Sequence, residues 1–264
     1  MELEYHHIDA FTDTVFKGNY AGVIITDDWL ENHVMQSIAT ENNVSETAFV
    51  VLNNGIYDIR WFSPLTEIDF CGHATLASAF VLFKKNISLS EITFYAEAVG
   101  QLKVCRAKDD YIAMTFPCRA PTKVSIVPRA LLEGLSIQLQ EVWQSQQAYF
   151  VIYDGEQAVH DVVQNVPLIK QLAPYDVVVT APVKDGEYDF VSRYFWPANG
   201  GDEDPVTGSI HAGLAPFWAQ RLGRNDLVAR QASARGGVIK CLVIGDQIEI
   251  SGRAVQYMKG MIEI

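Results

Sequence analysis

The chain has 264 residues, 49% of them hydrophobic, which is enough to bury one large core or two modest ones. Its formal net charge is −12 and its 20 lysines and arginines are scattered, so we expect binding neither to nucleic acid nor to a membrane surface. The first residues are acidic rather than the start of a signal peptide, and no apolar stretch approaches the about 20 residues that cross a bilayer, so we expect a cytoplasmic protein.

Strand signals dominate the sequence. Stretches rich in β-branched and aromatic residues are bounded by Gly, Asn, Asp or Pro, at residues 22–26, 47–52, 57–62 and 91–98, and similar stretches recur in the second half. A helix is predicted over residues 28–40, and a strand follows near Ser45. This places Glu46 at the polar start of a strand, where, taken alone, a solvated glutamate is the simplest interpretation.

Two helical segments, residues 73–85 and 209–223, are apolar on nearly all sides. A helix that is hydrophobic all round is buried all round. In a chain otherwise made of strands, the natural way to bury such a helix is to wrap a sheet around it. The sequence therefore predicts an α+β fold with two lobes, each a barrel-like sheet around a central apolar helix.

An internal repeat precedes these helices. The stretch RWFSPLTEIDFCGHATLASAF (residues 60–80) resembles RYFWPANGGDEDPVTGSIHAGLA (residues 193–215), and both contain Arg, Phe and Pro at alternate positions. Six residues separate Pro64 from Cys71, and nine separate Pro197 from Thr207. Because several features recur in the same order, we interpret the pattern as a degenerate duplication, although common residue types could also coincide.

The duplication predicts two domains. The N-terminal lobe is expected over residues 1–117, completed by residues 250–264, and the C-terminal lobe over residues 118–249. The turn-rich stretch at residues 116–130, with three prolines, is the expected crossover. Binding sites favour such interfaces between lobes.

The start of each buried helix could bind an anion. The first N–H groups of a helix have no intrahelical acceptors, and the helix dipole is positive there. Gly72 and Gly208 would let a ligand approach the backbone closely, which suits a small carboxylated substrate.

Side chains suited to chemistry stand beside these glycines. His73 can titrate near neutral pH, Ser209 can bind a carboxylate or cap its helix, and Asp204 lies just ahead of the second helix. The same residues would also suit an ordinary helix start and a satisfied, half-buried histidine. Their recurrence at equivalent points of two lobes favours a functional role.

The four cysteines are widely spaced, at positions 71, 105, 118 and 241, and no C-x-x-C pair is present. This argues against a disulfide framework or a zinc ribbon. No Walker loop and no G-x-G-x-x-G motif supports nucleotide binding. We therefore expect no metal, and we interpret Cys71 as a small packing residue.

Taken together, the motifs ENNVSETAFV, FCGHAT and DEDPVTGSIHAG, in this order, give the sequence a resemblance to the PhzF family of phenazine-biosynthesis-like isomerases. The opening stretch YHHIDAFTDTVFKGNYAGVI adds to it, with Tyr20 where the family often has proline. The resemblance covers nearly the whole chain. It implies the diaminopimelate epimerase fold, with two pseudo-symmetric lobes and the active site between them, and a homodimer.

The resemblance also implies roles for individual residues. Glu46 looks like the family's proton-shuttling glutamate, and His73 and Asp204 look like the partners that hold and polarise the substrate. Ser209 and the backbone at Gly72 and Gly208 look like the anchors for its carboxylate and polar groups. The family's chemistry moves a double bond in a cyclic dienyl amino acid without a metal or an organic cofactor.

Two alternatives remain at this point. A binding protein could keep the fold without turnover, although it would have no need of Glu46, His73, Asp204 and Ser209 together. A racemase or epimerase of this fold uses two cysteines, whereas the position equivalent to Cys71 is Thr207, whose hydroxyl is a poor base near neutral pH.

Overall fold

The structure of the protein is a computed structural model that describes residues 1–264. The chain divides into two compact units. Unit 1 comprises Met1–Thr115 and Ser251–Ile264, and unit 2 comprises Phe116–Ile250. Two strands, β8 (Ile112–Pro117) and β17 (Gln247–Gly252), contain the points at which the chain passes from one unit to the other.

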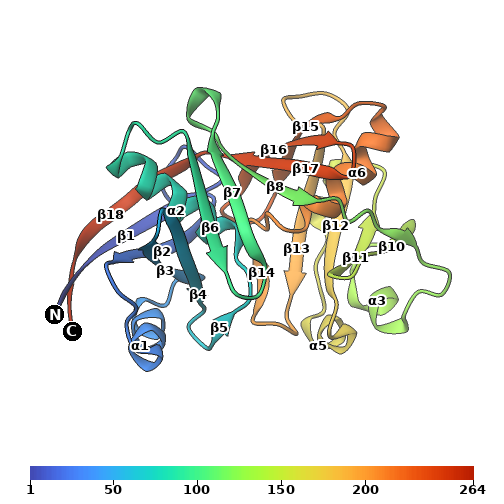
Figure 1. Cartoon of the computed structure of the whole chain (residues 1–264). Coiled ribbons are helices and arrows are strands. Elements are labelled where there is room, and N and C mark those ends of the chain that lie inside the picture. The colour runs from blue at the N-terminus through green and yellow to red at the C-terminus, as the bar shows by residue number, and fades with distance from the viewer. The chain divides into compact units, whose positions relative to one another are not determined.

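Unit 1 is built mainly from strands (Figure 1). Its other elements are β1 (Glu2–Ala10), β2 (Asn19–Thr26), α1 (Asn32–Asn42), β3 (Glu46–Asn53), β4 (Ile56–Phe62), β5 (Glu67–Ile68), α2 (Gly72–Lys85), β6 (Glu91–Ala96), β7 (Gly100–Arg106), the short 3-10 turn η1 (Lys108–Asp110) and β18 (Ala254–Glu263).

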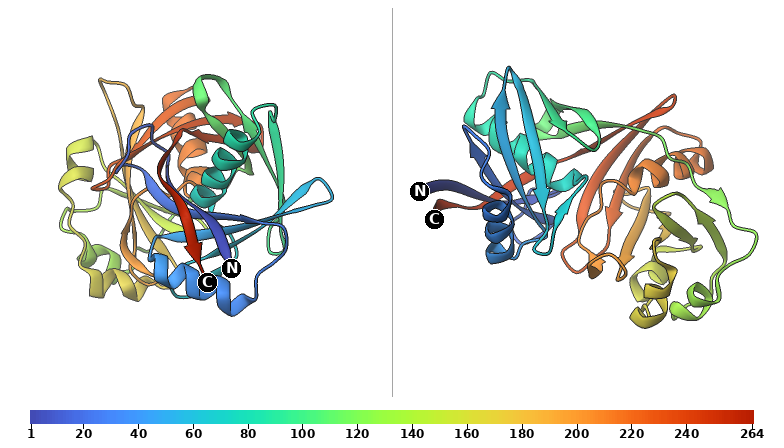
Figure 2. Two further views of the ribbon diagram at one scale, coloured as in Figure 1. Left: turned by 90° about the vertical axis from the view of Figure 1, so that its left-hand side faces the viewer. Right: turned by 60° about the horizontal axis from the view of Figure 1, so that its bottom comes forward.

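The sheet of unit 1 brings the two ends of the chain together. β1 pairs antiparallel with β18 on one side and with β2 on the other, so that Glu2 lies opposite Glu263. The two termini lie side by side in both views of Figure 2. From β2 the sheet continues through β3 in parallel, β4 antiparallel, β6 in parallel and β7 antiparallel.

Helix α2 is the core of unit 1. Eleven of the twelve residues from Gly72 to Phe83 are buried, and only Lys84 and Lys85 at the end of the helix are exposed. The helix contacts β1, β2, β3, β7 and β18. The prediction that an all-round apolar helix is wrapped by strands is therefore confirmed here.

Helix α1 covers the other face of the same sheet. Its Met35 and Ile38 pack with Phe49 and Phe62 of the strands. Because both faces of β3 are covered, its first six residues are all buried, which explains the run of apolar residues instead of an alternating pattern. The predicted helix over residues 28–40 is shifted by a few residues, since α1 begins at Asn32 and ends at Asn42.

Unit 2 repeats this plan with more helices on its surface. Its other elements are β9 (Thr122–Lys123), α3 (Arg129–Gly134), β10 (Glu141–Gln144), β11 (Ala148–Ile152), α4 (Glu156–Asp161), α5 (Val166–Ile169), the 3-10 turn η2 (Lys170–Leu172), β12 (Asp176–Pro182), β13 (Phe190–Trp196), β14 (Gly201–Asp204), α6 (His211–Leu222), β15 (Asp226–Gln231) and β16 (Gly237–Ile244).

The strand pairings of unit 2 follow the same order as those of unit 1. β10 pairs antiparallel with β11, β11 parallel with β12, and β12 antiparallel with β13. β13 then pairs antiparallel with β14 and parallel with β15, just as β4 pairs with β5 and β6. The internal repeat in the sequence thus corresponds to a repeat in topology.

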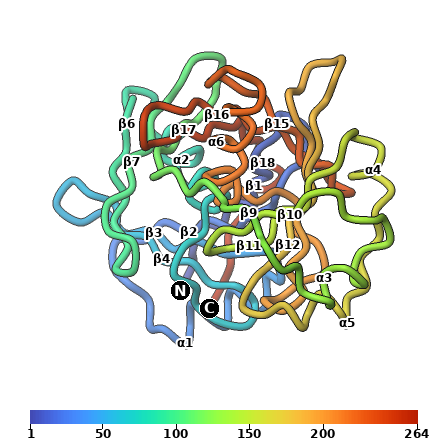
Figure 3. The backbone as a smooth tube through the Cα atoms, turned by 90° about the vertical axis from the view of Figure 1, so that its right-hand side faces the viewer, coloured from blue at the N-terminus to red at the C-terminus, as the bar shows by residue number.

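Helix α6 is the buried helix of unit 2, with eight buried residues between His211 and Ala219. A Cβ atom on Gly213 would lie 2.7 Å from the ring of Phe150, so glycine is needed for the close approach of this helix to β11. The face of the unit 2 sheet that points away from α6 is covered by Leu131, Val159 and Ile169 from α3, α4 and α5. Figure 3 shows α3 and α5 side by side.

The α+β class is confirmed, because the chain is mostly sheet with few helices. No helix in the structure is both long enough and apolar enough to span a membrane.

Candidate active site

Glu46 is the first residue of β3 and is buried. Helix α1 ends at Asn42, the left-handed conformation of its C-cap Asn43 (φ 47°) turns the chain sharply, and β3 begins three residues after Asn43. The side chain of Glu46 is only 8% exposed, since β3 lies between β2 and β4. The interpretation of Glu46 as a solvated strand residue is therefore wrong, because strand pairing buries it.

His73 provides the ionic partner of Glu46. It is the second residue of α2, and its Nε2 lies 3.0 Å from Oε2 of Glu46, with both side chains 8% exposed. Burial disfavours the charged imidazole, but the neighbouring Cys71 and Glu46 outweigh this effect and raise the pKa of His73 well above 6.5. The pair is thus an ion pair or a charge-assisted hydrogen bond in a nearly dry environment.

Cys71 completes a cluster of three titratable groups. Its Sγ lies 3.6 Å from Oε2 of Glu46 and 3.4 Å from Nδ1 of His73. Burial raises the pKa of the thiol to about 11, so it is protonated at neutral pH, and the charge that favours protonated His73 is that of Glu46. Cys71 therefore does more than pack, because it contacts both members of the pair.

Asn19 contacts the histidine and was not among the predicted site residues. The side-chain amide of Asn19 contacts Nδ1 of His73 at 3.2 Å and the hydroxyl of Ser45 at 3.1 Å. Asn19 follows Gly18, which has φ +65°, and a Cβ atom on Gly18 would lie 2.1 Å from the carbonyl oxygen of Ala10. The Gly-Asn dipeptide in the sequence was the signal, since it marks a turn that needs glycine and delivers an amide.

The same cluster offers three ligand types for a metal ion. One ligand atom each of Glu46, Cys71 and His73 lies within 4.8 Å of the others. A metal would have to displace the thiol proton, whose pKa is raised, and to break the direct contact between Glu46 and His73. The cluster thus suits a proton-transfer group better than a preformed metal site.

The start of α2 has no side-chain cap. Cys71 stands at the N-cap position without making a side-chain cap, and the nearest atoms to a Cβ built on Gly72 are ring atoms of Phe70 at 3.7 Å. The backbone at Gly72 is thus uncapped by any side chain, beside the Glu46–His73 pair.

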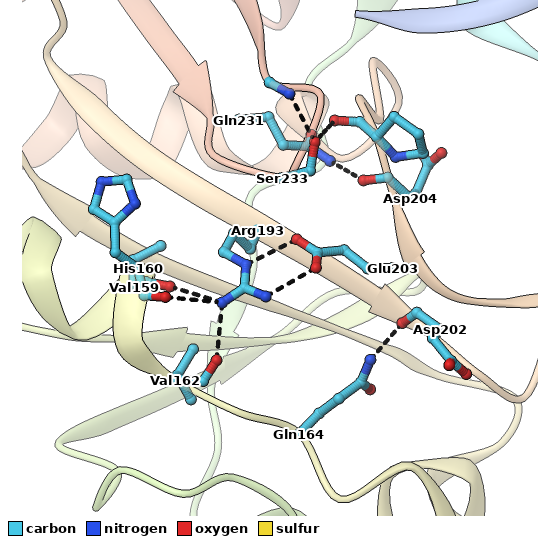
Figure 4. A network of polar contacts seen from close by, with 12 residues as sticks. Val159, His160, Val162, Gln164, Arg193, Asp202, Glu203, Asp204, Gln231 and Ser233 are labelled. Atoms are coloured by element: carbon cyan, nitrogen blue, oxygen red, sulfur yellow. Dashed lines mark hydrogen bonds and ion pairs between the residues drawn. The ribbon is translucent and has the colours of Figure 1, made fainter. Parts of the chain in front are cut away.

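In unit 2, an arginine fixes the strand that carries Asp204. Arg193 binds both carboxylate oxygens of Glu203 at 2.8 Å, and its Nη1 donates to the carbonyl of Val162 at 2.8 Å (Figure 4). In unit 1, Arg60 binds both carboxylate oxygens of Glu67 in the same way. Each arginine thus ties a short strand, β14 or β5, to the strand beside it.

Asp204 ends β14 and is held by Thr207 of the following loop and by Gln231 of β15. The hydroxyl of Thr207 donates to its carboxylate. Nε2 of Gln231 donates to its carbonyl oxygen at 2.8 Å (Figure 4). The backbone N–H of Thr207 donates in turn to Oε1 of Gln231 at 2.9 Å. Thr207, which occupies the position equivalent to Cys71, is therefore a partner of Asp204.

The predicted helix over residues 209–223 begins two residues later than expected, so Ser209 lies outside it. Gly208, Ser209 and Ile210 form a turn, and α6 begins at His211 with no side-chain cap. Hydrogen bonds from His211 to Gly208 and from Ala212 to Ser209 tighten this turn, so the serine hydroxyl is not used as a cap. It accepts instead a hydrogen bond of 3.0 Å from Nε2 of Gln147.

The predicted site residues thus fall into two groups. Glu46, Gly72 and His73 come together in unit 1. In unit 2, Asp204 ends β14, and Gly208 and Ser209 lie in the turn a few residues further on. The contacts of Cys71, Asn19 and Gln147 with these residues were not predicted, because each depends on strand pairing.

Sequence comparison identifies the family. The family model of phenazine biosynthesis-like proteins (PhzC-PhzF) matches residues 8–260. The chain belongs to this PhzF family. An uncharacterized isomerase from Pseudomonas aeruginosa is 45% identical to it over 264 residues, with both chains covered completely. Membership of the PhzF family and the names of such relatives indicate an enzyme of the isomerase or epimerase type.

Solved structures agree with this assignment to the PhzF family. A crystal structure of a PhzF family protein from Enterococcus faecalis superposes with a TM-score of 0.94 at 39% identity, covering all of both chains. A predicted epimerase from Pseudomonas aeruginosa gives a TM-score of 0.78 at 18% identity, covering 99% of each chain. At that identity the second match shows a shared fold alone.

Proposed function

We propose that the protein is a cofactor-independent isomerase that moves a proton, and with it a double bond, in a small carboxylated and conjugated substrate. The observation that carries the proposal is the buried contact between Glu46 and His73 at the start of α2. A carboxylate in a nearly dry environment, held by a titratable partner, is the arrangement that general acid–base catalysis on carbon requires.

Glu46 acts as the proton shuttle in this proposal. The contacts with His73 and Cys71 both engage Oε2, which leaves Oε1 as the oxygen for transfer. Glu46 removes a proton from an activated carbon, the electron pair of that C–H bond shifts along the conjugated system, and the same proton is returned at the far end. No electrons are gained or lost, so the step needs no redox partner.

The remaining groups bind the substrate. Gly72 presents uncapped backbone at the positive end of α2, which suits a carboxylate or another polar group. By the family resemblance, Asp204 of unit 2 polarises the substrate and Gly208 and Ser209 anchor it. This division assigns chemistry to unit 1 and recognition to unit 2.

Epimerisation by two thiols is the second candidate, since a predicted epimerase shares the fold. Two observations weigh against it. The pKa of Cys71 is raised to about 11, so a thiolate base is scarce at neutral pH. The equivalent position in unit 2 is Thr207, whose hydroxyl donates to Asp204.

The test is proton exchange in heavy water. We expect the protein to catalyse deuterium uptake and a double-bond shift, seen by NMR, in at least one member of a panel of cyclic and dienyl carboxylic acids that includes dihydro-hydroxyanthranilate. Glu46→Gln should reduce the exchange rate by at least about 100-fold, because the amide cannot accept the proton. Adding EDTA should leave the exchange unchanged.

The matched control is Glu41→Gln, which makes the same change at an exposed position of α1. It should retain the wild-type exchange rate. Loss of exchange in Cys71→Ser combined with activity in Glu46→Gln would replace the proposal with the thiol mechanism. Saturable carboxylate binding without exchange across the panel would favour a binding protein.

A further inference from the structure

Unit 2 contains a buried carboxylate at the position equivalent to Glu46. Asp176 is the first residue of β12, as Glu46 is the first residue of β3. In the parallel pairings Glu46 lies opposite Ala21 and Asp176 lies opposite Ala148. Asp176 is only 9% exposed, yet neither the family motifs nor the proposed shuttle uses it.

Two donors hold the oxygen atoms of Asp176. Tyr194 of β13 donates its hydroxyl to Oδ2 at 2.5 Å, and the amide of Asn199 donates to Oδ1 at 2.7 Å. Burial raises the pKa of Asp176, and the hydrogen bonds from Tyr194 and Asn199 act against this by favouring the ionised carboxylate. Burial and the neighbouring carboxylate raise the pKa of Tyr194, so its hydroxyl keeps the proton that it donates.

The chain of contacts continues to Ser209. The Nε2 atom of Gln147 lies 2.9 Å from the hydroxyl oxygen of Tyr194 and 3.0 Å from Oγ of Ser209. Because a carboxylate only accepts, the single hydroxyl proton of Tyr194 must point at Asp176, and its oxygen can only accept from Gln147. The two N–H groups of the amide are then shared between Tyr194 and Ser209.

This order fixes the direction of the last hydrogen bond. Oγ of Ser209 accepts from Gln147, and the structure gives its hydroxyl no other hydrogen bond within the protein. The proton of Ser209 is therefore available to a ligand. A hydroxyl held in this way offers a donor and favours an acceptor such as a carboxylate oxygen.

We propose that Asp176 is a positioning residue that, through Tyr194 and Gln147, holds the hydroxyl of Ser209 as a hydrogen-bond donor and so selects a carboxylate over its uncharged amide. The proposal deepens the proposed function, because it rests on Ser209 as a substrate anchor. It assigns a role to three residues that lie outside the family motifs.

The experiment measures a preference between two probes. Anthranilate and 2-aminobenzamide have the same ring and differ only in carboxylate against amide, and their dissociation constants for the full-length protein can be measured by calorimetry. We expect the wild-type protein to prefer anthranilate. Ser209→Ala defines the part of the preference that is due to this hydroxyl, and it should reduce the preference by about tenfold.

Asp176→Asn tests the relay itself. The new amide can donate to Tyr194, which then donates to Gln147, so that the order of donors reverses and Ser209 loses its fixed role. The preference for anthranilate should fall by about tenfold, as in Ser209→Ala, and Tyr194→Phe should reduce it by about threefold. Tyr153→Phe removes another buried tyrosine hydroxyl of unit 2, bound to the carbonyl of Ile137, and should leave the preference intact.

A purely structural role would weaken both probes equally, so an unchanged preference in Asp176→Asn overturns the proposal. It is also overturned by a wild-type protein without preference, or by a Ser209→Ala variant that keeps it. Failure of the proposed function is seen elsewhere, as absent proton exchange in a wild-type protein that still prefers anthranilate.

Discussion

Unit 1 and unit 2 share the order of their strand pairings but differ in the chemistry placed on it. The residues at four equivalent positions differ between the units. These positions are the start of β3 or β12, the end of β5 or β14, and the two neighbours of Gly72 or Gly208. The equivalent pairs are Glu46 and Asp176, Ile68 and Asp204, Cys71 and Thr207, and His73 and Ser209.

The difference separates titratable groups from fixed donors. In unit 1 a carboxylate, an imidazole and a thiol contact one another directly. In unit 2 two carboxylates accept hydrogen bonds from hydroxyl groups or amides, Asp176 from Tyr194 and Asn199, and Asp204 from Thr207. Under the proposed function, one scaffold carries a proton-transfer group in one repeat and a recognition group in the other, at the same backbone positions.

The largest expected effect tests this division in steady-state kinetics. Glu46→Gln should reduce kcat by at least about 100-fold, because it removes the group that carries the proton. Asp176→Asn should instead raise KM, by about tenfold, because it weakens only the anchoring of the carboxylate. Equal losses of kcat in the two variants would contradict the division between the units.

The two arginine clamps provide a smaller effect, on stability. Arg193 is 16% exposed and binds Glu203 and backbone carbonyls, whereas Arg60 is 26% exposed and binds the more exposed Glu67. Removing a partner from a buried pair costs more, so Arg193→Ala should lower the free energy of unfolding by about 3 kcal/mol and Arg60→Ala by about 1 kcal/mol.

Urea denaturation followed by circular dichroism measures both values. Arg129→Ala, which breaks an exposed pair with Glu133 on α3, is the control and should have no measurable effect. A larger loss of unfolding free energy in Arg60→Ala than in Arg193→Ala would show that burial does not determine the strength of the two clamps.

The smallest effect is on the titration of two histidines near the helix starts. The pKa of His73 is raised well above 6.5, whereas burial lowers the pKa of His211 to about 4. NMR titration of the imidazole nitrogens should show His73 protonated through pH 6.5 and His211 neutral down to about pH 4. In Glu46→Gln the pKa of His73 should fall, because burial then acts without the compensating charge.

The two pKa shifts predict how the stability of the fold changes with pH. The contribution of His73 is complete below pH 6.5 and is lost as the pH rises through its raised pKa in the folded state. For His211 the unfolded chain binds the proton more readily, so stability falls as the pH drops from 6.5 towards 4. A His73 that titrates below 6.5 in the wild-type protein would contradict the ion pair with Glu46.

Local patterns in the sequence predicted the α+β class and the two buried helices. The apolar run in α2 is visible along the chain, and the Arg-Phe-Pro repeat corresponds to two arginine clamps that bind glutamates in the same way. The PhzF resemblance was confirmed by the match to the family model. These features are encoded within a few turns or strands and need no knowledge of distant contacts.

Features that depend on contacts between residues far apart in the chain could not be predicted from local sequence patterns. The burial of Glu46 results from strands on both sides of β3, and Gln147 and Ser209 meet across 62 residues. The turn at Ser209 also could not be separated from the helix, because serine suits either position. The direction of each hydrogen bond in unit 2 follows only from the full set of partners.

The pairing of β1 with β18 has a consequence for synthesis on the ribosome. Unit 2 is one continuous segment, so all of its residues have emerged once position 250 leaves the exit tunnel. Unit 1 must wait for its last strand, and until then β1 has an open edge opposite the missing β18. The half of the molecule that is translated first is therefore the half that is completed last.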